Sequence, residues 1–185
     1  YMINFSYGTE KFKDTMFNTI CIGRAYEFLR HDLVEQMAEI QKDMHFNYCR
    51  CHALFHDDMA VAIRKPDGTL GFQWHHIDKF IDNLLSVGLK PFFEMQAMPS
   101  CMASDPKALM FHYEMNVSKP KDYREWYQLC RAFTSHIVDR YGLDEVRKWY
   151  FEVWNEPNIE GFWPHGMEEY YKLYENAARA VKSVD

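Results

Sequence analysis

The residues best suited to catalysis are an amide and a carboxyl group, Asn155 and Glu156, which Pro157 follows directly. The apolar run before them, residues 146–154, is rich in aromatic and β-branched residues, which predicts a strand buried on both faces. Pro157 cannot donate a ladder hydrogen bond and restricts the backbone of Glu156, so we expect the strand to end there. Because α/β barrels carry their chemistry at the carboxyl ends of strands, Glu156 is the predicted general acid.

The surroundings expected for Glu156 are aromatic. Trp154 precedes it, and Trp163 follows in the next stretch of sequence. Apolar walls disfavour the charged form of a carboxyl group, which suits a proton donor. The alternative is a carboxylate that is solvated or paired with a nearby arginine.

Arg50 and His52 alternate along another predicted strand, so their side chains share a face. Neither is easily buried without a partner or a ligand, and a sugar offers hydroxyl groups to both. The alternative, compatible with the first, is an ion pair of Arg50 with Glu94 or Glu156. Glu94 also ends a predicted strand; we expect it to orient Arg50 or His52, and it is the nearest second carboxylate for catalysis by the chain alone. Glu152 is expected to point away, toward the helices.

A metal site is the competing interpretation of one cluster of polar residues. His52, His56, Asp57 and Asp58 are residue types that bind zinc or manganese. Their spacing matches no standard site, and a loop in this position suits sugar hydroxyl groups equally well. We therefore expect neither a metal nor a cofactor.

Length and composition favour one well-buried domain. The chain has 185 residues, 48% hydrophobic and 17% aromatic, with a net charge of −6. Because basic runs are lacking, binding to nucleic acid or to an anionic membrane surface is disfavoured.

Cysteine usage and the N-terminal sequence predict a cytoplasmic protein. The five cysteines form no CxxC pair, so reduced thiols are expected, with Cys49 and Cys51 as small buried apolar residues. No apolar run is long enough to span a bilayer, and the first residues lack the order of a signal peptide.

Strand-like and amphipathic stretches alternate along the chain. The predicted strands cover residues 18–23, 47–53, 89–95 and 146–154, and the predicted helices cover 30–45, 75–87, 122–142 and 167–184. A turn is expected at 66–68, and the long loop 96–121 is expected to be functional. Repeated βα units predict a parallel sheet, and four of them are half of a (β/α)₈ barrel. An open sheet is the alternative, but it would expose one face of very apolar strands.

Three segments together resemble glycoside hydrolase family 39, which contains β-xylosidases and α-L-iduronidases. They are RCHALFHDDM from Arg50, KPFFEMQAMPS from Lys90 and WYFEVWNEPN from Trp149. The resemblance implies a retaining (β/α)₈ glycosidase whose general acid/base is Glu156. The implied sugar-binding residues are Asn155 at the 2-hydroxyl group, Arg50 and His52 in the glycone subsite, and Phe162 and Trp163 in the sugar-facing wall. The family's nucleophile, a second glutamate on strand seven, has no counterpart here.

We therefore expect residues 1–185 to be the N-terminal half of a glycosidase barrel, incomplete as a domain and inactive alone. The expected substrate is a xylo-oligosaccharide, with a β-xylosidase preferred to an iduronidase on overall likeness, and the expected partner is the C-terminal half. The competing hypothesis is a non-catalytic half-barrel that pairs with itself or with a complementary fragment through open strand edges.

Overall fold

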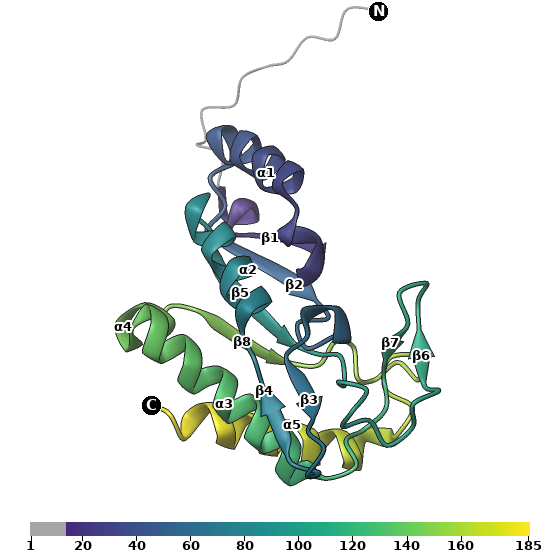
Figure 1. Ribbon diagram of the computed structural model, residues 1–185. Helices are drawn as coiled ribbons and strands as arrows, with labels where there is room; N and C mark the ends of the chain where they lie inside the picture. The colour runs from purple at the N-terminus through teal and green to yellow at the C-terminus, as the bar shows by residue number, and fades with distance from the viewer. Residues whose placement is uncertain (1–13) are drawn as a thin grey trace, which may run out of the picture.

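A parallel sheet is the centre of the molecule in the computed structural model, which describes residues 14–185. Its strands lie in the order β1-β2-β5-β8 (Figure 1). They are β1 (Thr19–Arg24), β2 (Tyr48–His52), β5 (Lys90–Met95) and β8 (Tyr150–Val153). Each neighbouring pair is parallel, which confirms the predicted α/β class. Residues 1–13, on which the signal-peptide expectation rests, lie outside the described residues.

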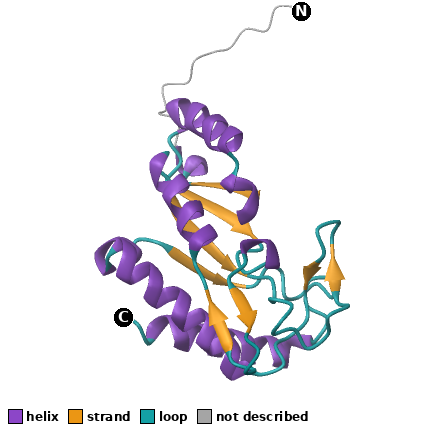
Figure 2. Cartoon of the chain, viewed as in Figure 1, coloured by secondary structure: helices purple, strands orange, loops and turns teal. Residues whose placement is uncertain are grey.

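Helices connect the strands (Figure 2). They are α1 (His31–Met44), α2 (His75–Ser86), α3 (Tyr123–Tyr141), α4 (Leu143–Val146) and α5 (Gly166–Lys182), with 3₁₀ helices η1 (Asp14–Phe17), η2 (Ala25–Leu29) and η3 (Asp57–Met59). The predicted caps are confirmed: Asp122 Oδ1 accepts from Arg124 N at 2.8 Å before α3, and Gly88 takes a φ of 79° after α2. None of the helices within residues 14–185 combines the length and apolar character needed to cross a membrane.

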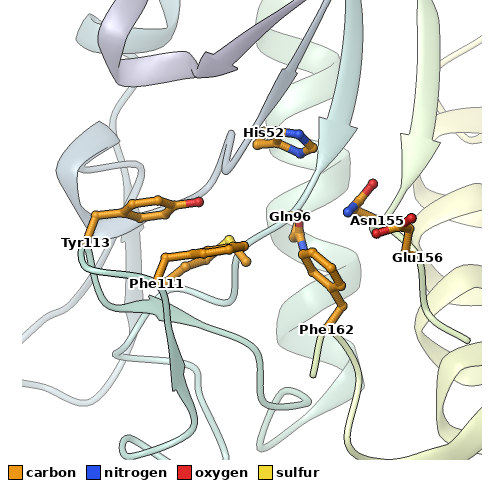
Figure 3. Close-up of a pocket in the computed structure, with 8 residues that line it drawn as sticks. His52, Gln96, Phe111, Tyr113, Asn155, Glu156 and Phe162 are labelled. Carbon is orange, nitrogen blue, oxygen red and sulfur yellow. The ribbon is translucent and has the colours of Figure 1, made fainter. Parts of the chain in front are cut away.

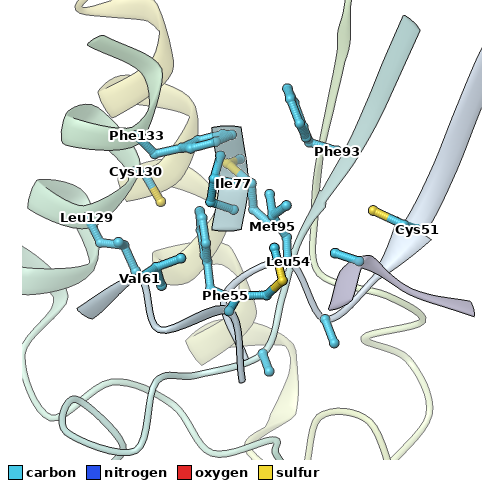
Figure 4. Close-up of a cluster of buried hydrophobic side chains, with 14 of the residues drawn as sticks. Cys51, Leu54, Phe55, Val61, Ile77, Phe93, Met95, Leu129, Cys130 and Phe133 are labelled. Atoms are coloured by element: carbon cyan, nitrogen blue, oxygen red, sulfur yellow. The ribbon is translucent and has the colours of Figure 1, made fainter. Parts of the chain in front are cut away.

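One face of the sheet packs against the helices and forms the core. Strand side chains on this face are apolar and buried: Cys49, Cys51, Phe93 and Met95. Phe93 meets Phe133 of α3 edge to face, with ring centroids 5.1 Å apart (Figure 4). All five cysteines are free thiols, and the expected burial of Cys49 and Cys51 is confirmed.

The opposite face of the sheet carries polar and half-exposed side chains. The parallel register pairs Arg50 with Phe92 and Glu94 with Glu152. Because paired residues in neighbouring strands point to the same side, Glu152 shares the face of Glu94. The prediction that Glu152 points toward the helices is therefore wrong. The prediction that the last strand is buried on both faces is wrong too, since Tyr150 is 50% exposed.

The last strand is also shorter than predicted. Val146 belongs to α4, and β8 begins only at Tyr150. Gly142, with a φ of 85°, ends α3 and opens this short helix. Glu145 then accepts a hydrogen bond from Trp149 Nε1 at 3.2 Å, which fixes the turn that leads into β8.

Two hairpins extend from the carboxyl ends of the strands. The turn predicted at residues 66–68 is confirmed between β3 (Ala62–Arg64) and β4 (Leu70–Phe72), with Gly68 N donating to Lys65 O at 2.9 Å. Within the long loop 96–121 lies a second hairpin, formed by β6 (Leu109–Met110) and β7 (Met115–Asn116).

Candidate active site

The carboxyl ends of β2, β5 and β8 meet at a pocket of about 330 Å³. It is lined by His52, Gln96, Phe111, Tyr113, Met115, Asn155, Glu156 and Phe162. Figure 3 shows Asn155 and Glu156 on one side, Phe111 and Tyr113 on the other, and His52 and Gln96 between them. Four of the predicted site residues are thus brought to one pocket: His52 from the end of β2, and Asn155, Glu156 and Phe162 from the segment after β8.

Glu94, which does not line the pocket, orients His52 through its carboxylate. Its carboxylate is fully buried and lies 3.0 Å from His52 Nδ1 through Oε1 and 2.8 Å through Oε2. The hydrogen bond to Glu94 raises the pKa of His52, while burial raises the pKa of Glu94 itself. With Nδ1 engaged, Nε2 of His52 is the ring nitrogen left without a hydrogen-bond partner in the described part of the chain.

Arg50 is a partly buried hub rather than a wall of the pocket. Its Nη2 lies 2.6 Å from Glu94 Oε2, so the predicted ion pair with Glu94 is confirmed. Its Nε and Nη2 also donate to the two carboxylate oxygens of Glu152 at 2.6 and 2.8 Å, and these bonds raise its pKa further. The remaining contact of Nη2 is Asn155 Oδ1 at 2.9 Å. The carboxylate partners are therefore Glu94 and Glu152, and Glu156 is not one of them.

A left-handed backbone turn presents Asn155 and Glu156 to the pocket. Trp154 and Glu156 have φ values of 66° and 44°, a region that side-chain-bearing residues seldom adopt. Such conformations concentrate at functional sites, where the surrounding structure must hold them. Here Trp154 N donates to Met95 O at 3.3 Å, and Ile159 N donates to Glu156 O at 2.9 Å.

The tryptophans near Glu156 support the loop from behind. Trp154 Nε1 donates to Phe162 O at 2.8 Å, and the Trp163 ring packs on Trp154 at 5.1 Å. Trp163 is 2% exposed and does not line the pocket, whereas Phe162 does. Glu156 itself is exposed, so the expected aromatic shielding of its carboxyl group by these tryptophans is wrong for the described residues.

An aromatic hairpin, which was not predicted from the sequence, forms the facing wall. Phe111 stacks on Tyr113 at 5.2 Å with 22° between the ring planes, and it approaches Phe162 at 5.9 Å. The unusual length of loop 96–121 was the available signal, together with its aromatic tripeptide at residues 111–113.

Two side chains anchor this hairpin to the strand ends. His56 Nε2 contacts the carbonyl oxygen of Tyr113 at 2.9 Å. The Arg24 guanidinium lies 4.4 Å from the centroid of the Tyr113 ring, in a cation–π contact, and is itself paired with Asp58. Tyr113 is thereby fixed at the pocket.

The residues considered as metal ligands have other partners. His52 binds Glu94, His56 contacts Asp58 at 2.9 Å, and Asp57 Oδ1 accepts from Ser100 N at 3.0 Å. In the described range 14–185, His, Cys, Asp and Glu side chains form no group of three or more that could hold a metal ion.

Comparison with known proteins relates the chain to sugar-cleaving enzymes. The family Glycosyl hydrolases family 39 matches residues 3–185. A β-xylosidase from Caldicellulosiruptor saccharolyticus is 45% identical over 99% of this chain and 38% of its own length. A β-xylosidase from Geobacillus stearothermophilus is 40% identical over 97% of this chain and 36% of its own.

A solved structure gives the same result. The monomeric β-xylosidase of Caulobacter crescentus CB15 superposes with a TM-score of 0.87 and 37% identity, over 91% of this chain and 34% of that one. The chain thus spans well under half the length of the relatives it matches. With nearly all of its residues matched, it belongs to glycoside hydrolase family 39.

Proposed function

We propose that this chain supplies the general acid/base and part of the sugar pocket of a retaining β-xylosidase that acts on xylo-oligosaccharides. The observation that carries the proposal is the convergence of His52, from the end of β2, with Asn155 and Glu156, which follow β8, on one pocket in a chain of family 39. The kinship with β-xylosidases at 45% and 40% identity supports this substrate class.

In the proposed mechanism Glu156 acts twice. Protonated Glu156 donates its proton to the glycosidic oxygen while a second carboxylate, from the remaining part of the barrel, attacks the anomeric carbon. The ionised Glu156 then removes a proton from water, whose oxygen attacks the glycosyl-enzyme and releases the sugar. Glu156 regains its proton in this second step, so the cycle closes.

The other site residues bind the sugar or hold its binding groups. Asn155 would donate to the 2-hydroxyl group, His52 would meet a further hydroxyl group through Nε2, and Phe162 would pack on the ring. Arg50 acts through Asn155, to which it donates a hydrogen bond at 2.9 Å. Glu94 acts through His52, whose Nδ1 lies 3.0 Å from its carboxylate. Trp163 supports the wall through Trp154. We assign Glu94 an orienting role rather than that of nucleophile, because Arg50 and His52 already engage it.

The charge of the pocket favours a neutral sugar over a uronic acid. Glu94, Glu152 and Glu156 lie in or under it, and within residues 14–185 its lining contains neither lysine nor arginine. The nearby Arg50 already binds Glu94, Glu152 and Asn155 through its Nε and Nη2 atoms. A sugar carboxylate would be repelled by this part of the site, which supports a xyloside rather than an iduronide.

We further propose that residues 1–185 are the first four βα units of a (β/α)₈ barrel. β1 and β8 are the edges of the described sheet. Beside β8, a hollow lined by Met95, Phe151, Val153 and Tyr174 would accept the next βα unit. The same edges would serve the competing function, a non-catalytic half-barrel that pairs with itself.

Hydrolysis of a xylo-oligosaccharide, whose leaving group needs a proton, tests these proposals. The chain alone and the chain mixed with the C-terminal half of a β-xylosidase relative would each be assayed beside Glu156→Gln. Activity in the mixture alone, sharply reduced by Glu156→Gln, is the expected result. Activity of the chain alone would make Glu94 the second carboxylate. Well-folded but inactive protein in both assays would favour the assembly function.

A further inference from the structure

Gln96 is a buried amide in the wall of the pocket that the proposed mechanism does not use. It follows β5 directly and has no exposed surface. Its backbone is held on both sides, because Gln96 O accepts from Phe55 N at 2.7 Å and Gln96 N donates to Glu94 O at 2.8 Å. The side chain therefore starts from a fixed point at the pocket, between His52 and Phe162 in Figure 3.

Neither atom of the Gln96 amide has a hydrogen-bond partner among residues 14–185. Other buried amides of the chain are paired: Asn83 Nδ2 donates to Phe28 O at 2.8 Å, and Asn116 Oδ1 accepts from Ser118 Oγ at 2.7 Å. Burying an amide without a partner costs free energy, and natural proteins seldom leave one so. An unpaired amide in a pocket wall points to a ligand that completes it.

The chemistry of the pocket restricts that ligand. An amide offers one acceptor and one donor group, the complement of a hydroxyl group, which also does both. The carboxylate of Glu156 in a lining without lysine or arginine disfavours an anion, and the described residues provide no group of side chains that could hold a metal ion. Phe111 and Phe162 supply apolar surface for the ring that carries the hydroxyl group.

We propose that Gln96 is a specificity-determining residue whose amide binds a hydroxyl group of the sugar ring. This inference rests on the proposed function and adds to it a residue that recognises the glycone. Rotation about the soft terminal torsion of the glutamine side chain presents an amide atom to the pocket when the sugar enters. A sugar that lacks the hydroxyl group leaves the amide unpaired and is rejected.

The test uses this chain fused to the remaining part of the Caldicellulosiruptor saccharolyticus relative. Aryl β-xyloside and its 2-, 3- and 4-deoxy analogues are hydrolysed by the fusion and by its Gln96→Met variant. We expect Gln96→Met to lower kcat/KM for the xyloside about tenfold, the usual effect of one lost hydrogen bond. In the unmodified fusion each deoxy analogue should have a lower kcat/KM than the xyloside, and Gln96→Met should remove this difference for one analogue only. If Gln96→Met left the difference in kcat/KM between the xyloside and each of the three analogues unchanged, the inference would be overturned.

Thermal unfolding of the sugar-free fusion separates this role from a structural one. Gln96→Met removes an unpaired amide, so the Tm should stay constant or rise. The matched control is Asn83→Leu, which strips Phe28 O of its donor and should lower the Tm. If Gln96→Met lowered the Tm and left the preference for the xyloside over its deoxy analogues unchanged, the amide would instead have a structural role, as the hydrogen-bond partner of a buried water. Lack of β-xyloside hydrolysis by the unmodified fusion would refute the proposed function, and this inference with it.

Discussion

Arg50 Nη2 donates to Asn155 Oδ1 at 2.9 Å and so fixes which end of the Asn155 amide faces the pocket. With its oxygen held by a cation, Asn155 has its Nδ2 group left to donate to a ligand. The same guanidinium binds both oxygens of Glu152 and one oxygen of Glu94. Arg50 thus orients a pocket residue and offsets part of the negative charge of two carboxylates.

Replacing Arg50 should destabilise the chain strongly. Arg50→Met leaves the fully buried Glu94 without its guanidinium partner, and losing one partner of a buried ion pair costs about 3–5 kcal/mol in the free energy of unfolding, with the lower end expected here because Arg50 is partly exposed and His52 still contacts Glu94. Urea unfolding measures the loss. The control is Arg179→Met, whose partner Glu175 is 3.7 Å away with both side chains 68% exposed, and which should cost less than about 0.5 kcal/mol. Equal losses for the two variants would contradict the role of Arg50 as the partner that compensates Glu94.

The effect of Glu156→Gln should depend on the leaving group. In the fused barrel, a xylo-oligosaccharide needs its departing oxygen protonated, so we expect kcat/KM to fall about 10²–10⁴-fold. The aryl group of an activated aryl xyloside leaves without that proton. The kcat/KM for this substrate, which reports the first step, should therefore fall much less. Steady-state rates with the two substrates measure the difference. Glu160→Gln, an exposed glutamate in the same loop, is the control and should change neither rate. Equal losses with both substrates would argue against a proton donor.

The general organisation of the chain was predictable from residue periodicity, but the side of the sheet on which Glu152 lies was not. Alternation places side chains relative to neighbours in one strand, whereas the relation between Arg50 and Glu152 depends on register across β5. That register is set by packing on the helix-facing side. The left-handed backbone at Trp154 and Glu156 then breaks the alternation, so their directions could not be derived from it either.

The polar part of the site was predictable because its residues follow strands, and strand ends meet. The aromatic wall was not, because no motif marks it. Gln96 also follows a strand, but its significance comes from an unpaired amide, which only the folded structure reveals. Tyr113 reaches the pocket through the contact of its carbonyl group with His56, a residue far away in sequence. Such a contact follows from the folded path of a long loop rather than from local residue types.

Stability should depend on pH through His52. Its hydrogen bond with Glu94 raises its pKa above the usual 6.5, so the folded chain holds this proton more tightly than the unfolded chain. The stability it contributes is fully present below about pH 6.5 and is lost as the pH rises through the raised folded-state value. His52→Gln should therefore flatten the decline in the free energy of unfolding above that pH.

Urea unfolding at a series of pH values measures this slope. Burial lowers the pKa of His56, but its hydrogen bond and charge interaction with Asp58 raise it overall, so part of the slope should remain in His52→Gln. His31→Gln, at a side chain that is 87% exposed, is the control and should keep the original profile. An unchanged profile in His52→Gln would show that the His52–Glu94 contact does not stabilise the fold.

The aromatic wall should affect sugar binding more than chemistry. Phe111 is 48% exposed and stacks on Tyr113, so Phe111→Ala should leave the Tm nearly unchanged. In the fused barrel we expect KM for an aryl xyloside to rise several-fold with kcat kept, the pattern of lost uniform binding. Ile63→Ala, at a residue 56% exposed outside the pocket, is the control. A fall in kcat at constant KM would instead place Phe111 against the transition state.

The chain by itself should associate. β1 and β8 leave their outer edges unpaired in the described sheet, and Tyr171 and Tyr174 of α5 are 62% and 50% exposed. Tyr174 lines the hollow beside β8. Sedimentation velocity should show oligomers that grow with concentration, and Tyr174→Lys should reduce them while Ile63→Lys, at an equally exposed residue elsewhere, does not. A sharply melting monomer would contradict an open half-barrel.

Addition of the C-terminal half then separates the two functions. If these edges belong to a glycosidase barrel, the added half should occupy them, replace the oligomers by one heterodimer and bring hydrolysis of aryl β-xyloside with it. If the chain is an assembly module, its self-association should persist at equimolar C-terminal half and no hydrolysis should appear. Because mass and activity are measured on the same samples, a heterodimer without activity would confirm the completed barrel and refute the role of Glu156.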